Sequence, residues 1–400
     1  MANTNAGDVL SGVRASAASA SVYSSRVLST RDAVLDIKPE WDALCARQSG
    51  PTAFQSHAFC MAWMDANVFC QNAKTSARII TIRNMQGALV TLFPLAVSNS
   101  RVLRTAEWIG EPLIQYGDAL IDPQADAEAI RVALSNATGD DFLVDAFHFR
   151  KVRKDSRIQA LLDLKGVQVG EAEEAAIIDL DAHDSYDAYA KATFSNRSRK
   201  NRRKKRRTLE AEGTLSFDIA DDPAKVREIL DTALRWKREW LAERGLTSRA
   251  FADEHALSTL VDVADTPGTS AVAGVLRLNG APVSVEFGFL DDYGFLAYLG
   301  SYNPAYDHLS PGKIAMEEMA RALMDRGYAR YDLLAPNSEY KKHWTEDTHP
   351  VADYFVPLSI MGLAYRSIYL NLLRSQLKDL SQKAPPWLVS AGLRARNSLK

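Results

Sequence analysis

The sequence lacks the features of a membrane-spanning or disulfide-stabilised protein. No apolar run approaches the roughly 20 residues that a transmembrane helix needs. The three cysteines, Cys45, Cys60 and Cys70, are an odd number and have no metal-ligand spacing. Residues 1–25 are rich in Ala and Ser but contain no apolar core of a secretory signal. We therefore expect a cytoplasmic protein, because free cysteines suit a reducing compartment.

Signatures of metal, nucleotide and covalent chemistry are also missing. The sequence has no GxGxxG fingerprint, no P-loop, no kinase motif set and no nucleophile elbow or placed Cys–His pair. No two histidines stand at metal-ligand spacing beside carboxylates; they are His57, His148, His183, His255, His308, His343 and His349. We therefore expect no metal site and no covalent enzyme intermediate.

What remains is an ordinary globular composition. The chain has 400 residues, which is long for one core and predicts two domains. Hydrophobic residues make up 46% and charged residues 24% of the sequence. The net charge is only −2, so any attraction to nucleic acid or acidic lipid must come from a local cluster.

Residues 271–344 form the most informative stretch. It predicts strands at residues 271–278, 282–290, 293–300 and 331–334, with Asn279-Gly280 as a hairpin turn between the first two. A helix is expected between the third and fourth strands, because Met316, Met319, Ala320 and Leu323 recur at helical spacing. The stretch ends in the box Tyr340-Lys341-Lys342-His343-Trp344.

That helix opens with Ser310-Pro311-Gly312-Lys313. Such a start exposes unpaired backbone N–H groups at the positive end of the helix dipole. Gly312 allows a ligand to approach the backbone closely, and Lys313 adds positive charge. The turn is either a simple helix cap or a site for a phosphate or pyrophosphate group.

A run of nine cations lies between residues 197 and 207. A charge run is often a solvated helix face, but nine cations within three turns cover every face, and their repulsion favours an anionic partner. The partner is either a phosphate-rich ligand, such as coenzyme A, a nucleotide-sugar or tRNA, or a nonspecific RNA or acidic-lipid surface. The run consists of Arg197, Arg199, Lys200, Arg202, Arg203, Lys204, Lys205, Arg206 and Arg207.

Taken in order, these motifs resemble the GNAT-type acyltransferases of the CelD-like branch, which is related to the FemAB aminoacyl transferases. The resemblance covers roughly residues 35–357. The motifs are specific for the family when they are taken together in this order, but they carry little information about the substrate. The residues that carry it are Trp41, 51–56, 108–118, 197–213, Ser310-Pro311-Gly312, Gly327-Tyr328, Tyr331-Asp332 and Tyr340–Trp344.

The resemblance implies an α/β (α+β) protein with two tandem GNAT-like domains, each a mixed, mostly antiparallel sheet flanked by helices. We expect a disordered N-terminus at 1–30, an N-terminal domain at 31–185 and the transferase domain at 186–358. A basic helical tail at 359–400 would contain a helix over residues 360–378, which packs on the domain, binds a partner or lies on a membrane surface. A further helix is expected at 126–138.

In GNAT folds the pantetheine of an acyl-CoA lies along a splayed strand, and its pyrophosphate sits at the start of the next helix. Here that strand would be residues 293–300, and the pyrophosphate site would be Ser310, Pro311, Gly312 and Lys313. Backbone N–H groups of the strand would stabilise the oxyanion. The acyl-CoA, expected to be acetyl-CoA, is a cosubstrate, and no covalently bound cofactor is expected.

Three residues are candidates for catalysis. Glu286 lies on the polar side of an apolar strand, where burial would raise its pKa towards that of a useful base, or else it is structural. Asp332 occupies a matching family position, or else forms an ion pair at a strand end. Lys341 follows Tyr340 as in the FemAB box, where a lysine stabilises charge on the donor, although Trp344 replaces the Phe-Gly found there. The alternative for Lys341 is an exposed surface lysine.

The predicted function is an N-acyltransferase that moves an acyl group from acyl-CoA to a small-molecule, peptide or sugar amine. Arg199, Arg203 and Tyr340 are expected to bind the substrate. One alternative is a transferase that uses aminoacyl-tRNA to build peptides. Another is a catalytically silent accessory protein of envelope polysaccharide biosynthesis.

Overall fold

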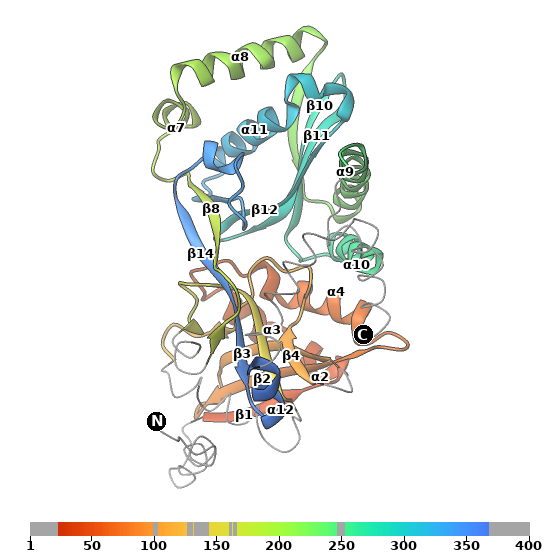
Figure 1. The fold of residues 1–400 in the computed structure, drawn as a ribbon, viewed down its shortest axis with the longest axis vertical. Coiled ribbons are helices and arrows are strands. Elements are labelled where there is room, and N and C mark those ends of the chain that lie inside the picture. Colours follow the sequence, from red (N-terminus) through yellow and green to blue (C-terminus); the bar gives the residue numbers. More distant parts are fainter. Residues whose placement is uncertain are drawn as a thin grey trace.

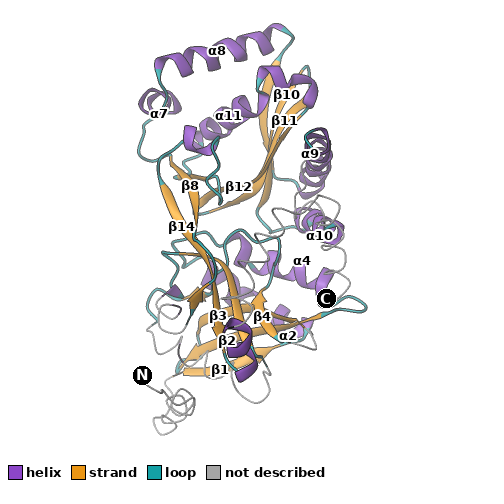
Figure 2. Cartoon of the chain, viewed as in Figure 1, coloured by secondary structure: helices purple, strands orange, loops and turns teal. Residues whose placement is uncertain are grey.

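The computed structural model describes residues 23–98, 103–125, 131, 144–159, 162, 166–245 and 253–367 (Figure 1). Most of the helix expected at 126–138, and the expected tail beyond residue 367, lie outside the described residues. The described chain forms two halves that lie end to end along the long axis, each with strands covered by helices (Figure 2). The predicted fold class is therefore confirmed.

Fourteen strands of the described chain form one continuous sheet. In the N-terminal half the order is β1 (Tyr23–Leu28), β2 (Thr75–Asn84), β3 (Leu89–Ser98), β4 (Thr105–Trp108), β6 (Ala146–Arg153) and β14 (Thr348–Pro357). The order continues through β8 (Glu173–Asp179), β13 (Arg330–Asp332), β12 (Gly294–Tyr302), β11 (Ala281–Asp291), β10 (Ala271–Leu278) and β9 (Leu215–Ala220). Two short strands pair at the side, β5 (Leu120–Ile121) with β3 and β7 (Val167–Gln168) with β14. Only β4–β6 and β12–β13 are parallel pairs, and the other pairs are antiparallel.

The two halves exchange strands where they meet. β8 precedes the expected boundary at residue 185, yet it pairs with β13 of the C-terminal half. β14 follows the transferase stretch, yet it pairs with β6 of the N-terminal half. β8 and β14 also pair with each other and so join the two parts of the sheet. The two-domain division remains a proposal. In it, the C-terminal half takes β8 from the chain before residue 185, and the N-terminal half takes β14 from the chain after it.

The helices begin where the sequence supplies caps. Ser56 accepts a hydrogen bond from Phe59 N at the start of α4, and Asp222 accepts one from Lys225 N at the start of α9. The N-terminal half contains α2 (Arg31–Asp36), α3 (Lys38–Cys45), η1 (Ala53–Gln55) and α4 (His57–Asn67). The C-terminal half contains α7 (Tyr186–Thr193), α8 (Asn196–Ala211), α9 (Pro223–Glu243), α10 (Glu254–Asp265), η2 (Pro304–Leu309), α11 (Pro311–Asp325) and η3 (Lys341–His343), and α12 (Ile360–Tyr365) follows β14.

Two expectations at the chain ends differ from the structure or lie partly outside it. Residues 23–28, expected to be disordered, form β1, which pairs with the edge of β2. Residues 1–22 lie outside the described residues. Of the helix expected at 360–378, the described part is α12, on which Ile360 and Met361 are exposed. No helix in the described ranges is apolar over a length that would cross a membrane.

Helices cover both faces of the sheet in the C-terminal half (Figure 1). Val285, Phe287 and Phe289 of β11 pack in the same core as α9 residues such as Leu230. The opposite face packs against α11, where a Cβ atom on Gly274 would lie 2.5 Å from Met319 Cε. Since Gly274 pairs with Glu286 across β10 and β11, the Glu286 side chain is on the α11 face. The alternation predicted for this strand holds from Val285 onward and places a carboxylate under a helix, whereas Val283, at the bulge between β10 and β11, packs with Ile314 of α11.

Candidate active site

β12 and β13 separate after a short pairing. They pair only at Phe295 with Tyr331 and at Leu296 with Asp332. The register between β11 and β12 then shifts by one residue, which leaves Tyr298 as the extra residue of a bulge. Among the described residues, no strand pairs with the β13-facing edge of β12 beyond this point. Those backbone N–H groups of residues 297–302 that point away from β11 therefore border an opening between two strands.

Glu286 lies beside this opening. It is 7% exposed, and the Tyr331 hydroxyl donates a short hydrogen bond to its Oε2. Burial raises the pKa of Glu286 to about 7, which the Tyr331 hydrogen bond partly offsets. Gly300 pairs with Glu286 on β12, is exposed, and has no surrounding atom within 4 Å of the position that a Cβ atom would take. Glu286 is therefore a buried carboxylate, and the free space lies beside it at Gly300 rather than in the cleft described below, whose lining does not include Glu286.

The Ser310–Lys313 turn lies where β12 leads through η2 into α11. Ser310 has a φ of 54°, and its hydroxyl accepts a hydrogen bond from Lys205 Nζ at 2.5 Å. A Cβ atom on Gly312 would meet only Tyr302 Cδ1, at 3.5 Å. Burial, followed by the charges of Arg202 and Lys205, lowers the pKa of Lys313. Three cations are therefore gathered at the positive end of a helix of 15 residues.

A cleft of about 810 Å³ opens at this turn. Its walls come from the end of β8 and the loop after it, α7, α8, the first turns of α11, and η3 with the segment that follows it. The cleft therefore joins the predicted anion turn to the basic helix and to the end of the Tyr340–Trp344 box. The lining residues used below are Phe194, Ser198, Arg202, Lys205, Ser310, Lys313, Glu317, Lys342, His343 and Trp344.

The basic helix α8 has two different faces. On its inner face, Arg202 pairs with Glu317 at 2.8 Å and Arg206 pairs with Glu318. The Arg202 guanidinium also stacks 3.8 Å from the Phe194 ring centroid. On the outer face five cations are exposed, and the described part of the chain provides an ion-pair partner for none of them. They are Arg197, Lys200, Arg203, Lys204 and Arg207.

The three predicted substrate-binding residues do not line this cleft. Arg203 is on the outer face of α8. Arg199 is half-buried and donates to the Asn196 side chain. Tyr340 is 54% exposed and stands just before η3. Their assignment to substrate stays a prediction.

Lys341 is a buried residue rather than a surface lysine. It is 8% exposed, and its Nζ donates to the carbonyl oxygens of Leu334 and Pro336, both at 2.9 Å. Burial lowers the pKa of Lys341 to about 8, which the nearby charge of Asp332 partly offsets. The residue fixes the loop between β13 and η3, and it is not part of the cleft lining. Its expected contact with the donor therefore stays a prediction.

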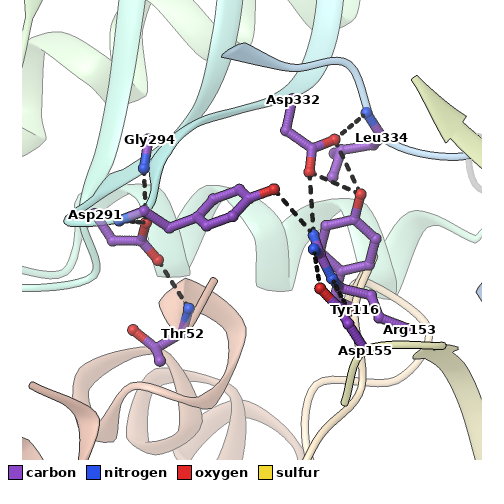
Figure 3. Close-up of polar contacts among 9 residues, drawn as sticks. Thr52, Tyr116, Arg153, Asp155, Asp291, Gly294, Asp332 and Leu334 are labelled. Carbon is purple, nitrogen blue, oxygen red and sulfur yellow. Dashed lines mark hydrogen bonds and ion pairs between the residues drawn. The ribbon is translucent and has the colours of Figure 1, made fainter. Parts of the chain in front are cut away.

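Asp332 is fully buried between the two halves. Its carboxylate accepts hydrogen bonds from the Tyr116 hydroxyl, at 2.9 and 2.8 Å, and from Leu334 N at 2.8 Å (Figure 3). Arg153 Nη1 lies 3.6 Å away. Burial raises the pKa of Asp332 to about 6, although these groups and Lys341 all favour the charged form. Asp332 thus forms an ion pair at a strand end, which is the alternative to a catalytic role. Its partner, Arg153, belongs to the other half.

Sequence reasoning missed Tyr116, Arg153 and Tyr298. Tyr116 falls within the motif at residues 108–118, but its partner Asp332 is 216 positions away. The Tyr298 hydroxyl donates to Leu113 O at 2.9 Å, again from one half to the other. The roles of these residues depend on contacts between the two halves. Their partners are distant in the sequence, so no local sequence pattern predicts these contacts.

The arrangement is suited to acyl transfer. It offers a cationic helix start for phosphates, unpaired strand N–H groups for an oxyanion and a carboxylate that can take up a proton near neutral pH. The described ranges contain no cluster of three His, Cys, Asp or Glu residues that would bind a metal ion.

Comparisons with known proteins agree with this geometry. Residues 196–342 match the family described as the acetyltransferase (GNAT) domain. The fold is similar to the crystal structure of FemX, with 14% identity and a TM-score of 0.59, over 83% of this chain and 98% of that one. It is also similar to a conserved protein of unknown function from Bacteroides thetaiotaomicron, with 14% identity and a TM-score of 0.55, over 84% of this chain and 100% of that one. No curated protein matches the sequence significantly.

The sequence match covers the half that contains α8, α11, β12 and β13, and the structural similarity extends over both halves. At such low identity the structural similarity shows a shared fold and not a shared substrate. Residues 196–342 therefore contain a GNAT-type acetyltransferase domain, which supports a transferase, and the fold of the chain is similar to that of FemX.

Proposed function

We propose that the protein is an N-acyltransferase that transfers an acyl group, with acetyl as the expected case, from an acyl-CoA donor to an amine. The observation that carries this proposal is the cleft of about 810 Å³ that contains the Ser310–Lys313 turn together with Lys205 and Arg202. A pyrophosphate at this turn would meet Gly312 N–H and the Lys205 and Lys313 ammonium groups. The pantetheine would then run along the open edge of β12 towards Gly300.

In this arrangement Glu286 is the proton acceptor. The amine nitrogen attacks the thioester carbonyl carbon, and strand N–H groups of β12 stabilise the oxyanion. A C–N bond forms, the C–S bond breaks, and one proton passes from nitrogen to the Glu286 carboxylate. Coenzyme A leaves as a thiolate, which takes up a proton. A pKa of about 7 leaves much of Glu286 ionised at neutral pH and able to accept the proton.

Thermal stabilisation by coenzyme A, acetyl-CoA and longer acyl-CoAs tests the donor assignment. A ligand that binds only the folded protein raises the melting temperature. We expect a rise in the wild type that Gly312→Asp abolishes and Lys205→Ala reduces. Lys204→Ala is the matched control, because Lys204 is the neighbouring cation on the outer face of α8. An equal rise in all variants, or no rise with any coenzyme A species at millimolar concentration, would overturn the assignment.

A second candidate donor is an aminoacyl-tRNA. The five exposed cations on the outer face of α8 support it, since a phosphate backbone would satisfy them. In this case tRNA binding would weaken steeply with salt and would be lost in the charge reversal Arg203→Glu/Lys204→Glu. Binding of tRNA without any response to coenzyme A would favour this donor. A lack of response to either would favour an accessory role in envelope polysaccharide biosynthesis.

For the acceptor and the cellular location we propose only general classes. The acceptor would be a small-molecule, peptide or sugar amine. The three cysteines are free thiols, which supports the cytoplasm as the location. The exposed Ile360 and Met361 support a peripheral contact of the C-terminal helix with a membrane or partner.

A further inference from the structure

A loop of the N-terminal half contacts both strands of the transferase half where they separate. Tyr116 donates to Asp332 at the end of β13, and Leu113 O accepts from Tyr298 at the bulge of β12. Since Asp332 and Leu296 are in the last β12–β13 pair, the loop at residues 113–116 sits where the strands part. Its position is suited to setting how far the strands separate.

The end of β6 supports the same contact. Arg153 is 6% exposed and donates to both Asp155 oxygens, at 2.9 and 2.8 Å, and to the Tyr293 hydroxyl at 3.2 Å. Its guanidinium lies 5.0 Å from the Tyr116 ring centroid. Figure 3 shows the Arg153 guanidinium beside the Tyr116 ring, with Asp332 on one side of it and Asp155 on the other. The N-terminal half thus presents an ordered hydroxyl and a fixed positive charge to one buried carboxylate.

From Asp332 a short series of contacts leads to the cleft. Its carboxylate binds Leu334 N, and Leu334 O accepts from Lys341 Nζ. Lys341 O in turn accepts from Trp344 N at 2.8 Å, and Trp344 lines the cleft beside Arg202. Residues 332–344 therefore form one hydrogen-bonded segment between the N-terminal half and the cleft wall.

We propose that Tyr116 and Arg153 are positioning residues for the transferase cleft, because they hold Asp332 and so fix the segment at residues 333–345 against the donor. The N-terminal half then has a catalytic task without touching the reacting atoms. Its contribution is to keep the far wall of the donor cleft in place. This inference rests on the proposed donor cleft, but the order of the segment can be measured without any ligand.

The structure supplies a matched control. Asp291, in the turn between β11 and β12, accepts hydrogen bonds from Thr52 N and Ala53 N at 2.8 and 3.0 Å. This contact also joins the two halves, and Asp291 is linked to the Asp332 group indirectly, because Tyr293 N donates to Asp291 and the Tyr293 hydroxyl accepts from Arg153 (Figure 3). It does not involve β13 or the segment at 333–345. Loss of the Asp291 contact therefore reports on general loosening between the halves.

The experiment compares Tyr116→Phe, Arg153→Lys and Asp291→Ala with the wild type in the full chain. Tyr116→Phe removes one hydroxyl and keeps the ring beneath Arg153. Amide hydrogen exchange of residues 333–345 is measured without ligand, and the dissociation constant for coenzyme A and the KM and kcat for acetyl-CoA are measured separately. We expect Tyr116→Phe and Arg153→Lys to speed exchange in this segment and to weaken coenzyme A binding at least fivefold. Asp291→Ala should lower the melting temperature without either effect.

Unchanged exchange at 333–345 in Tyr116→Phe would overturn the inference, as would an equal change in Asp291→Ala. If the wild type does not bind coenzyme A, the proposed donor fails. The exchange result would still decide whether the N-terminal half orders this segment.

Discussion

Gly300 lies directly opposite Glu286 across the β11–β12 pair and leaves open space beside that carboxylate. On the other side of Glu286, Gly274 is covered by Met319 and Phe217. The buried carboxylate is therefore enclosed on the Gly274 flank, and the open space at Gly300 lies on its other flank.

Filling this space should abolish transfer without unfolding the protein. Gly300→Val is expected to lower kcat/KM at least a hundredfold, because its methyl groups would occupy the room left for the acyl group. The melting temperature should stay near that of the wild type, since no surrounding atom lies within 4 Å of the new Cβ. Gly50→Val, at a similarly open position outside the site, is the control. A fully active Gly300→Val would contradict the proposed acyl position.

Glu286→Gln should stabilise the protein increasingly as the pH rises. Burial raises the pKa of Glu286 from 4.5 to about 7, so the folded protein holds this proton more tightly than the unfolded chain. The stabilisation is complete below pH 4.5 and is lost as the pH rises to about 7. Above that pH the buried charge costs on the order of 3 kcal/mol.

Melting curves of the wild type and Glu286→Gln at about pH 5.5 and pH 8 measure this effect. The gain from the substitution should be larger at pH 8. Transfer should fall by about 10²–10⁴-fold, as for loss of a general base. The wild-type rate should rise through a pKa near 7 as Glu286 ionises. An equal gain in melting temperature at both pH values would mean that Glu286 does not carry the shifted pKa.

Lys341→Met should destabilise the fold even though the side chains are similar in length. The substitution leaves Leu334 O and Pro336 O without their buried donor, which costs about 2 kcal/mol. Denaturant unfolding measures the loss. Lys342→Met is the control, because Lys342 is exposed and pairs only with Glu339 at the surface. Unchanged stability in Lys341→Met would show that Lys341 does not hold the loop through these two hydrogen bonds.

Arg202 and Glu317 should be energetically coupled. Both side chains are nearly buried, at 12% and 11% exposure, and Arg202 also stacks on Phe194 and Trp344. A double-mutant cycle with Arg202→Met and Glu317→Gln should give a coupling of about 1.5–3 kcal/mol. A coupling near zero would show that the ion pair does not hold α8 against α11.

Local patterns in the sequence predicted much of the fold of the transferase half. The alternation at Val285, Phe287 and Phe289 predicted the face of β11 that packs with α9, and Asn279-Gly280 forms the expected hairpin with both φ angles positive. The amphipathic helix α9 begins after Asp222, a residue type that commonly caps helices. These features depend on neighbours within a few residues, so the sequence contains them directly.

Features that depend on distant partners could not be predicted. β1 has no clear alternation of apolar and polar residues, and it forms a strand because it pairs with the edge of β2. In the site, the residues Ser310–Lys313 themselves predict a turn at the start of a helix. The alternation of β11 predicts that Glu286 lies on the face opposite Val285 and Phe287. The direction of the Lys341 side chain does not, because it depends on the fold of the loop at Leu334 and Pro336.

The exchange of β8 and β14 has a consequence for synthesis on the ribosome. The N-terminal half cannot complete its sheet until β14, at residues 348–357, has left the exit tunnel. Until then the edge of β6 is exposed, and an exposed strand edge favours aggregation. A nascent chain of this protein would thus expose this edge until residues 348–357 have been made, and stopping translation before β14 would not give a complete N-terminal half.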